Sequence, residues 1–370
     1  MAKLKWSVWN ISQSSLDVTQ YVQSLSFTLG RPSPLTAYSG NSASVTMFSY
    51  GGIENYVNVQ DELLLFAEDP SGAERSLFLG RITSRTFDDN PGSGINSTMT
   101  VSLSDAMLQA GVANLQSAAF ISLYDQINEI VGLLPQIELL SAPTDIAMAV
   151  GTFTTNANQR INEIISGDRG VIANFSGLGI YYPPREFNGL INTSIDFGRT
   201  ASATQVAYQD INRVEAASNS LFYTQATVTG SASTVTMTAL DSAYYFGVRT
   251  FTATTAQSEK VSETAEWYAN AFVDPEIVVL NLSFTDVAQN DTALAELNTL
   301  FAITKFVEVR YTPPGGTEIT GYFWPEQITF NATTSQTTID MVMTPLTYYA
   351  NFTLDDSVLG VLDTDRLGVS

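Results

Sequence analysis

Carboxylates are the only abundant side chains in this sequence that could do acid–base or metal chemistry. The chain has 37 Asp and Glu residues, but it has no His and no Cys. Zinc sites built from Cys and His are therefore excluded, and so are Ser-His-Asp and Cys-His catalysis. Histidine is also the usual general base near neutral pH. Any catalytic site would have to use carboxylates, Lys, Tyr or a hard cation.

The acidic residues form a few short clusters that could bind calcium. Asp88-Asp89-Asn90 opens a turn rich in Gly, and calcium prefers oxygen ligands supplied by loops. The spacing does not follow a calcium-loop pattern, because no Glu stands at the required distance. Asp355-Asp356 and Asp363-x-Asp365 lack such a pattern too. We therefore interpret these clusters as solvated turns and expect no metal site.

Other candidate chemistry has equally weak support. A pair of carboxylates could form a glycosidase, but chance pairs are inevitable among 37 of them. Gly92-Ser93-Gly94 and Gly177-Leu178-Gly179 lack the lysine of a phosphate-binding loop. The tryptophans could stack on sugars, but their wide spacing favours packing in a core or an interface; they are Trp6, Trp9, Trp267 and Trp324. We expect no catalytic residues, no cofactor and no enzymatic activity.

The composition favours a protein that assembles with its neighbours. Apolar residues make up 44% of the chain and charged residues only 14%, so it can bury large cores while Ser, Thr, Asn and Gln cover much of its surface. The net charge of −21 and the lack of a basic stripe argue against specific nucleic-acid binding. The acidity could keep DNA from sticking to a channel wall, or could simply confer solubility. With no transmembrane run and no signal-peptide pattern, we expect synthesis in a cytoplasm.

Residues 1–108 have the pattern of an all-β region. Leu25, Phe27 and Leu29 alternate with Ser26 and Thr28, which predicts a half-buried strand. Similar strands are predicted around residues 45–47 and 99–103. The apolar run at residues 63–66 suits a strand that is covered on both faces.

Residues 109–200 predict a smaller α+β region, and residues 201–350 are again rich in strands. A helix is expected at 123–134, another at 158–166, a third at 261–272 and a short one at 294–301, with strands at 171–175, 179–182 and 277–284. A hairpin is expected from 306–312 and 319–324 around Pro313-Pro314-Gly315-Gly316, followed by strands at 328–330 and 339–343. Residues 351–370 lack clean periodicity, and fit either an arm that docks onto a neighbour or a frayed terminus.

The order of several short motifs resembles one protein family. A strand ending in Gly30-Arg31 is followed by a segment of small residues, a second strand and a closing L-F-L-G-R-I strand. Further motifs follow in the family's order: Gly167 to Ile172, Tyr208 to Val214, Pro313 to Thr317, Phe352 to Ser357 and Leu359 to Asp363. Together they resemble the minor tail proteins of long-tailed bacteriophages, of the baseplate-hub or tail-tip kind, over nearly the whole chain.

This resemblance implies a mainly β architecture with two tube-like β-barrel regions, residues 1–108 and 201–350, separated by the α+β region at 109–200, with an arm at 351–370. It also implies a homotrimer in which three copies present six barrels around a channel for DNA. The partners would be the tail tube or distal tail protein, the tape measure and the tip or fibre proteins, within the virion tail tip. The alternatives are a sixfold distal tail ring, a host-surface carbohydrate-binding tail module and a carboxylate-based hydrolase.

Overall fold

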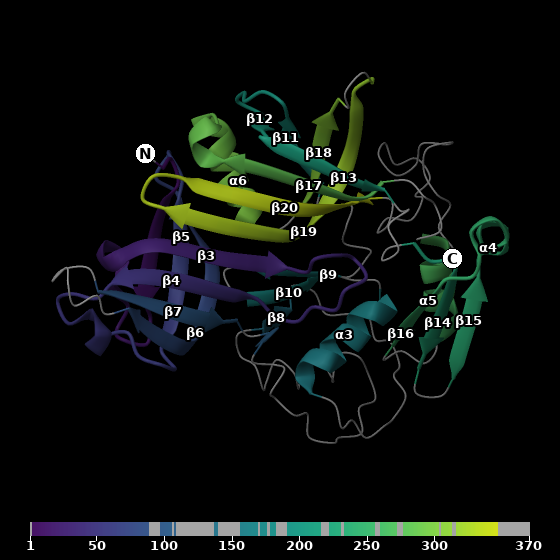
Figure 1. Ribbon diagram of the computed structural model, residues 1–370, viewed down its shortest axis with the longest axis horizontal. Helices are drawn as coiled ribbons and strands as arrows, with labels where there is room; N and C mark the ends of the chain where they lie inside the picture. The colour runs from purple at the N-terminus through teal and green to yellow at the C-terminus, as the bar shows by residue number, and fades with distance from the viewer. Residues whose placement is uncertain are drawn as a thin grey trace.

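The structure is a computed structural model dominated by β-strands (Figure 1). It describes residues 2–88, 97–105, 107–108, 137–139, 156–168, 171–175, 178–182, 191–215, 222–230, 233–255, 260–271, 277–302, 305–312 and 316–346. The mainly β fold class predicted from the sequence is confirmed. The helix predicted at 123–134 and the arm predicted at 351–370 lie outside the described residues. Among the described residues, no helix is long and apolar enough to cross a membrane.

The N-terminal strands form an antiparallel sheet in the order β3-β4-β7-β6-β5-β1-β2. The strands are β1 (Lys5–Asn10), β2 (Leu16–Asp17), β3 (Val22–Gly30), β4 (Ser42–Phe48), β5 (Glu62–Glu68), β6 (Glu74–Asp88) and β7 (Thr98–Ser104). The predicted alternation is confirmed in β3, where Leu25, Phe27 and Leu29 are buried. They pack in a core with the inward side chains of the neighbouring strands, so the opposite face carries the polar residues.

The C-terminal strands form a second group in the order β12-β11-β18-β19-β20-β17-β13. The strands are β11 (Ile191–Gly198), β12 (Gln205–Ala207), β13 (Asp210–Glu215), β17 (Ile277–Thr285), β18 (Phe306–Tyr311), β19 (Ile319–Thr333) and β20 (Thr337–Pro345). Because β12 and β13 are separated by only two residues, both ends of the strand order lie on one stretch of chain and the sheet curls back toward its start. Closure of either group into a complete barrel stays a prediction.

One long strand joins the two groups into a single fourteen-stranded sheet (Figure 1). The first part of β19 pairs with β18, and its second part pairs with β3 on the same edge, while β20 occupies the other edge. The sequence predicted two separate strands, at 319–324 and 328–330. The structure instead has one strand with a register shift between Pro325 and Gln327, because the chain passes the proline through a β-bulge rather than a turn.

The bulge is held by a buried ion pair between β19 and the end of β3. Arg31 Nε lies 2.7 Å from Glu326 Oε2, and both side chains are almost fully buried. The Arg31 backbone N–H donates to the Glu326 carbonyl at 2.8 Å. Gly30 has a φ of +92°, and a Cβ added there would lie 1.9 Å from the same carbonyl oxygen. Only glycine therefore lets β3 approach the bulge this closely.

The segment that follows Arg31 ties this joint to a helix, α3 (Ala157–Asp168). The Asn162 side chain accepts a hydrogen bond from the Tyr38 N–H at 2.7 Å and donates one to the Tyr38 carbonyl at 2.9 Å. The prediction of a helix at 158–166 is confirmed by α3, and the strands predicted near it are confirmed by β9 (Val171–Phe175) and β10 (Leu178–Tyr182). These two strands pair with β8 (Ile137–Leu139) in a three-stranded sheet.

A third sheet stands at the opposite end of the molecule from the N-terminus (Figure 1). Its order is β15-β14-β16, from β14 (Gln225–Thr229), β15 (Thr234–Thr238) and β16 (Thr250–Thr254). Helix α5 (Val261–Ala271) packs against β14 and β15, and α4 (Leu240–Phe246) follows β15. The predicted helices at 261–272 and 294–301 are confirmed, the second as α6 (Asp291–Ala302). Sequence reasoning missed α4.

A pair of glycine substitutions tests the joint. Gly30→Ala should lower the free energy of unfolding by about 2–4 kcal/mol, because it adds both left-handed strain and a backbone collision. Gly72→Ala is the matched control, since Gly72 has a φ of +86° but a Cβ there would meet nothing within 4 Å. The Gly72→Ala substitution should lower the free energy of unfolding by about 1 kcal/mol, from backbone strain alone. Urea unfolding measures both values, and equal losses would contradict the close approach of β3 and β19.

Candidate functional site

Across six strands of the fourteen-stranded sheet, one face carries mostly hydroxyl and amide side chains. We call it the polar face. Its residues come from β3, β4, β7, β19, β20 and β17, and are Ser24, Ser26, Thr28, Ser42, Ser44, Thr46, Thr98, Thr100, Ser102, Thr329, Asn331, Thr338, Asp340 and Ser283. The strand register carries rows of these residues across the sheet, such as Ser102–Ser44–Ser26–Asn331–Thr338. The polar face therefore runs from the N-terminal strands into the C-terminal strands without a break.

Hydrogen bonds between neighbouring strands satisfy many of these groups. Ser26 Oγ donates to Asn331 Oδ1 at 2.8 Å, and the hydroxyls of Thr28 and Thr329 are 3.1 Å apart. Asp340 is the only charged member, and its Oδ1 accepts from Ser283 Oγ at 2.6 Å. A surface of this kind is well hydrated, but it offers phosphate no cationic partner. It can face a polyanion without binding it tightly.

Two carboxylates with shifted pKa values, Glu326 and Asp105, lie buried at or next to the joint. Burial raises the pKa of the Glu326 carboxyl, and the adjacent Arg31 guanidinium counteracts this effect. Burial likewise raises the pKa of Asp105, whose carboxylate accepts hydrogen bonds from Asn41 Nδ2 at 2.6 Å and from the Leu108 N–H at 2.9 Å. Because these carboxylates are enclosed and bonded to neighbouring structure, we assign them to holding the joint rather than to catalysis.

A second distinctive surface lies on α4 and the residue pair that follows it. Tyr244 and Tyr245 are 84% and 77% exposed, and Leu240 is 77% exposed. Phe246 and Val248 extend this aromatic patch, at 47% and 63% exposed. So many large apolar side chains on one short stretch are unusual for a solvated surface and make this a candidate interaction site. The sequence did contain a signal, a cluster of large apolar residues at 240–248, but the cluster has neither strand nor helix periodicity.

The sheet beside the aromatic patch presents threonines on its open face. Registered rows of Thr and Gln cross its three strands, as in Thr252–Thr227–Thr236. The hydroxyls of Thr227 and Thr236 are 2.9 Å apart. The opposite face carries apolar side chains, including Val228 and Ala226, against α5. An aromatic patch next to an uncharged polar surface has the composition of a protein–protein interface with an apolar centre and a polar rim.

The tryptophans and acidic residues considered as candidate sites from the sequence do not form a common site among the described residues. Trp6 packs against Phe27 and Phe330 at 5.8 Å between ring centroids, and Trp324 is fully buried. Of the predicted acidic turn, only Asp88 lies among the described residues, and the acidic clusters after residue 350 lie outside them. Within the described part of the chain, no three acidic side chains are arranged to hold a metal ion.

Comparisons with known proteins match the structure but not the sequence. No family model matches the chain, and no curated protein matches it. A tail protein from Neisseria meningitidis has a similar structure, with a TM-score of 0.62 at 10% identity over 94% of this chain and 98% of that one. The 43 kDa tail protein of prophage MuSo2 from Shewanella oneidensis gives a TM-score of 0.60 at 7% identity over 93% and 99%.

A third similar structure comes from the PdpA–VgrG complex of Francisella. Its TM-score is 0.53 at 11% identity, over 96% of this chain and 59% of the matched chain. All three matches extend over both groups of strands and the regions between them, because each spans more than nine-tenths of this chain. At sequence identities of 7%, 10% and 11%, the similarity to these structures shows a shared fold and nothing further. The resemblance to phage tail proteins indicated by the order of the sequence motifs is therefore confirmed: the chain has the mainly β fold of phage tail proteins.

Proposed function

We propose that this chain is a structural component of a phage tail tip, and that it is the hub that continues the tail tube. The observation that carries the proposal is the polar face, which crosses both groups of strands through the pairing of β3 with β19. Three copies would present six such groups of strands around an axis, which matches a threefold hub to a sixfold tube. The likeness to phage tail proteins over nearly the whole chain supports this role.

In this proposal the polar face lines the channel through which DNA passes. A wall that carried Lys and Arg would bind phosphates and retain the duplex. The residues that define the polar face include neither type, and their single carboxylate would add only weak repulsion at physiological salt. Beyond them, the same rows continue to Arg81, which is neutralised by Glu62 at 3.1 Å, and to Asp210. Its hydroxyls would exchange hydrogen bonds with channel water. The wall would thus be wet and non-adhesive, as a conduit for a polyanion requires.

The partners in this proposal are other copies of the chain and neighbouring tail proteins. The tail tube or distal tail protein and the tape measure would meet the channel, while tip or fibre proteins would attach on the outside. The aromatic patch of α4 fits an outer attachment point, because it lies far from the N-terminal strands (Figure 1). The protein would be made in the host bacterial cytoplasm and would act in the virion without catalysing a reaction.

The native mass and symmetry test the hub directly. The chain has a mass of 40.1 kDa, so a threefold hub should appear at about three times this mass by light scattering, with threefold class averages in electron microscopy. A sixfold ring of about six times the chain mass would instead identify the distal tail ring. A species that stays monomeric at high concentration would contradict both roles.

Removing the two exposed tyrosines tests the aromatic patch. The double variant Tyr244→Ser, Tyr245→Ser should change the free energy of unfolding by less than about 0.5 kcal/mol, because both rings are solvated in the isolated chain. It should weaken attachment of a neighbouring tail protein by about 30-fold for each lost anchor. Co-purification with co-expressed neighbouring tail proteins measures the second effect.

The matched control for this test is Thr252→Ser, on the exposed face of the adjacent sheet. It should leave both stability and attachment unchanged. Normal attachment by the double tyrosine variant would show that the aromatic patch is not part of the interface. Loss of binding to a glycan array, with protein attachment intact, would assign the patch to the carbohydrate-binding alternative.

A further inference from the structure

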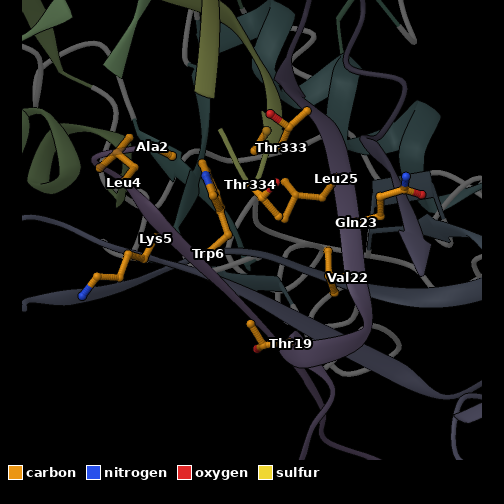
Figure 2. A pocket seen from close by; sticks show the side chains of 11 residues that line it. Ala2, Leu4, Lys5, Trp6, Thr19, Val22, Gln23, Leu25, Thr333 and Thr334 are labelled. Atoms are coloured by element: carbon orange, nitrogen blue, oxygen red, sulfur yellow. The ribbon is translucent and has the colours of Figure 1, made fainter. Parts of the chain in front are cut away.

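The N-terminal strands leave a seam between the two ends of their sheet. On one side is β1, and on the other are the first residues of β3 and the turn after β19. A pocket of about 170 Å³ lies in this seam. Figure 2 shows Leu4 and Trp6 on one side of it, with Val22, Leu25 and Thr334 on the other. We call this the seam pocket.

The edge of β1 that borders the seam pocket has one open backbone position. Along this edge, the Leu4 N–H donates to Asp286 Oδ2 at 3.0 Å and the Val8 N–H donates to Thr19 Oγ1 at 2.8 Å. Backbone groups point to the same edge of a strand at every second residue, so those of Trp6 point there too. Neither the N–H nor the C=O of Trp6 has a hydrogen-bond partner on this edge among the described residues.

The size and lining of the pocket suit a single apolar side chain. A protein cavity of about 150 Å³ holds a benzene molecule, so the seam pocket has room for one branched aliphatic or aromatic group. Buried Leu4, Leu25 and Ala332 form apolar walls. An apolar pocket beside an open backbone position can bind a short extended segment, through main-chain hydrogen bonds to Trp6 and one anchoring side chain.

We infer that the seam pocket receives an extended segment from residues 351–370 of an adjacent copy of this chain. This inference rests on the proposed assembly, which supplies the adjacent copy. The segment contains Val358-Leu359-Gly360-Val361-Leu362, an apolar stretch flanked by Asp355, Asp356, Asp363 and Asp365. Lys3 and Lys5, two of the few lysines in the chain, lie at the β1 edge but already pair with Asp291 at 2.8 Å and with Glu68 at 2.7 Å, so the apolar stretch is the part of the segment that would anchor it.

The length of the chain allows this connection. Strand β20 begins at Thr337, whose hydroxyl accepts a hydrogen bond from Trp6 Nε1 at 2.7 Å, and ends at Pro345. At about 3.3 Å per residue, the strand carries the chain about 26 Å away from the seam. The 24 residues after Leu346 can extend for about 80 Å, which is enough to cross to a neighbouring subunit. A strand inserted there would pair with Trp6 and close the seam.

A mixed-copy disulfide experiment tests this inference, because the natural chain has no cysteine. One variant carries Thr334→Cys, at an exposed position in the pocket lining. The other carries a single cysteine at position 358, 359, 361 or 362. The two variants are mixed, allowed to assemble and oxidised. At least one pairing should give a disulfide-linked product at twice the 40.1 kDa chain mass. The matched control Thr86→Cys, also exposed but on β6, should give none.

Truncation after residue 350 provides an independent readout. The truncated chain should keep its unfolding midpoint as an isolated subunit but lose the three-copy species at concentrations where the full chain forms it. A truncated chain that assembles as well as the full chain would overturn the inference. So would a full chain that forms threefold assemblies without any cross-linked product, although the hub proposal would then stand.

Discussion

The ion pair between Arg31 and Glu326 fixes how the two halves of the sheet meet. It lies at the point where β19 exchanges β18 for β3 as its edge partner. Buried ion pairs add little net stability over apolar residues, but leaving one partner unpaired costs about 3–5 kcal/mol. The ion pair therefore acts mainly on the specificity of the pairing between β3 and β19, rather than on the stability of the fold. Any other register of β3 against β19 would bury one of these charges alone, so the bulge and the strand pairing are selected together.

The polar face depends on this register. Side chains alternate along a strand, so a slip of one residue between β3 and β19 would put Phe27 and Leu29 on the solvent side. With the observed register, Ser26 meets Asn331 and Thr28 meets Thr329. The same register stacks the Phe27 and Phe330 rings at 4.5 Å on the core side. One pairing therefore produces both the hydrophobic core and the uncharged surface, and the proposed channel wall follows from core packing.

Local patterns in the sequence account for much of the fold. The alternation in β3 and β4 and the helical spacing in α3, α5 and α6 are properties of adjacent residues, and each predicted an element that the structure contains. The pairing of β3 with β19 joins residues about 300 positions apart, and no local signal encodes it. The sequence predicted separate strands on the two sides of Pro325, and proline normally interrupts a sheet. The bulge that accommodates it requires Gly30 and Glu326, which come together only in the folded chain.

The polar face, the aromatic patch and the seam pocket could likewise not be predicted from local sequence patterns. Sequence alternation did imply that Ser and Thr face away from the core in each strand, but it could not show that six strands align these residues into one face. The clustered apolar residues of α4 were visible in the sequence, whereas their exposure was not. The seam between β1 and β3 depends on where the strand order stops, which only the topology reveals. The proposed function of this chain therefore rests on surfaces made by distant strands rather than on a motif.

Electron cryo-microscopy of the assembled protein would show where the polar face lies. We expect a threefold reconstruction in which β3, β4, β19 and β20 surround a central channel, with Ser26, Thr28, Thr329 and Asn331 facing the axis. A reconstruction in which these residues face the outside of the assembly, or are buried against another protein, would contradict this expectation.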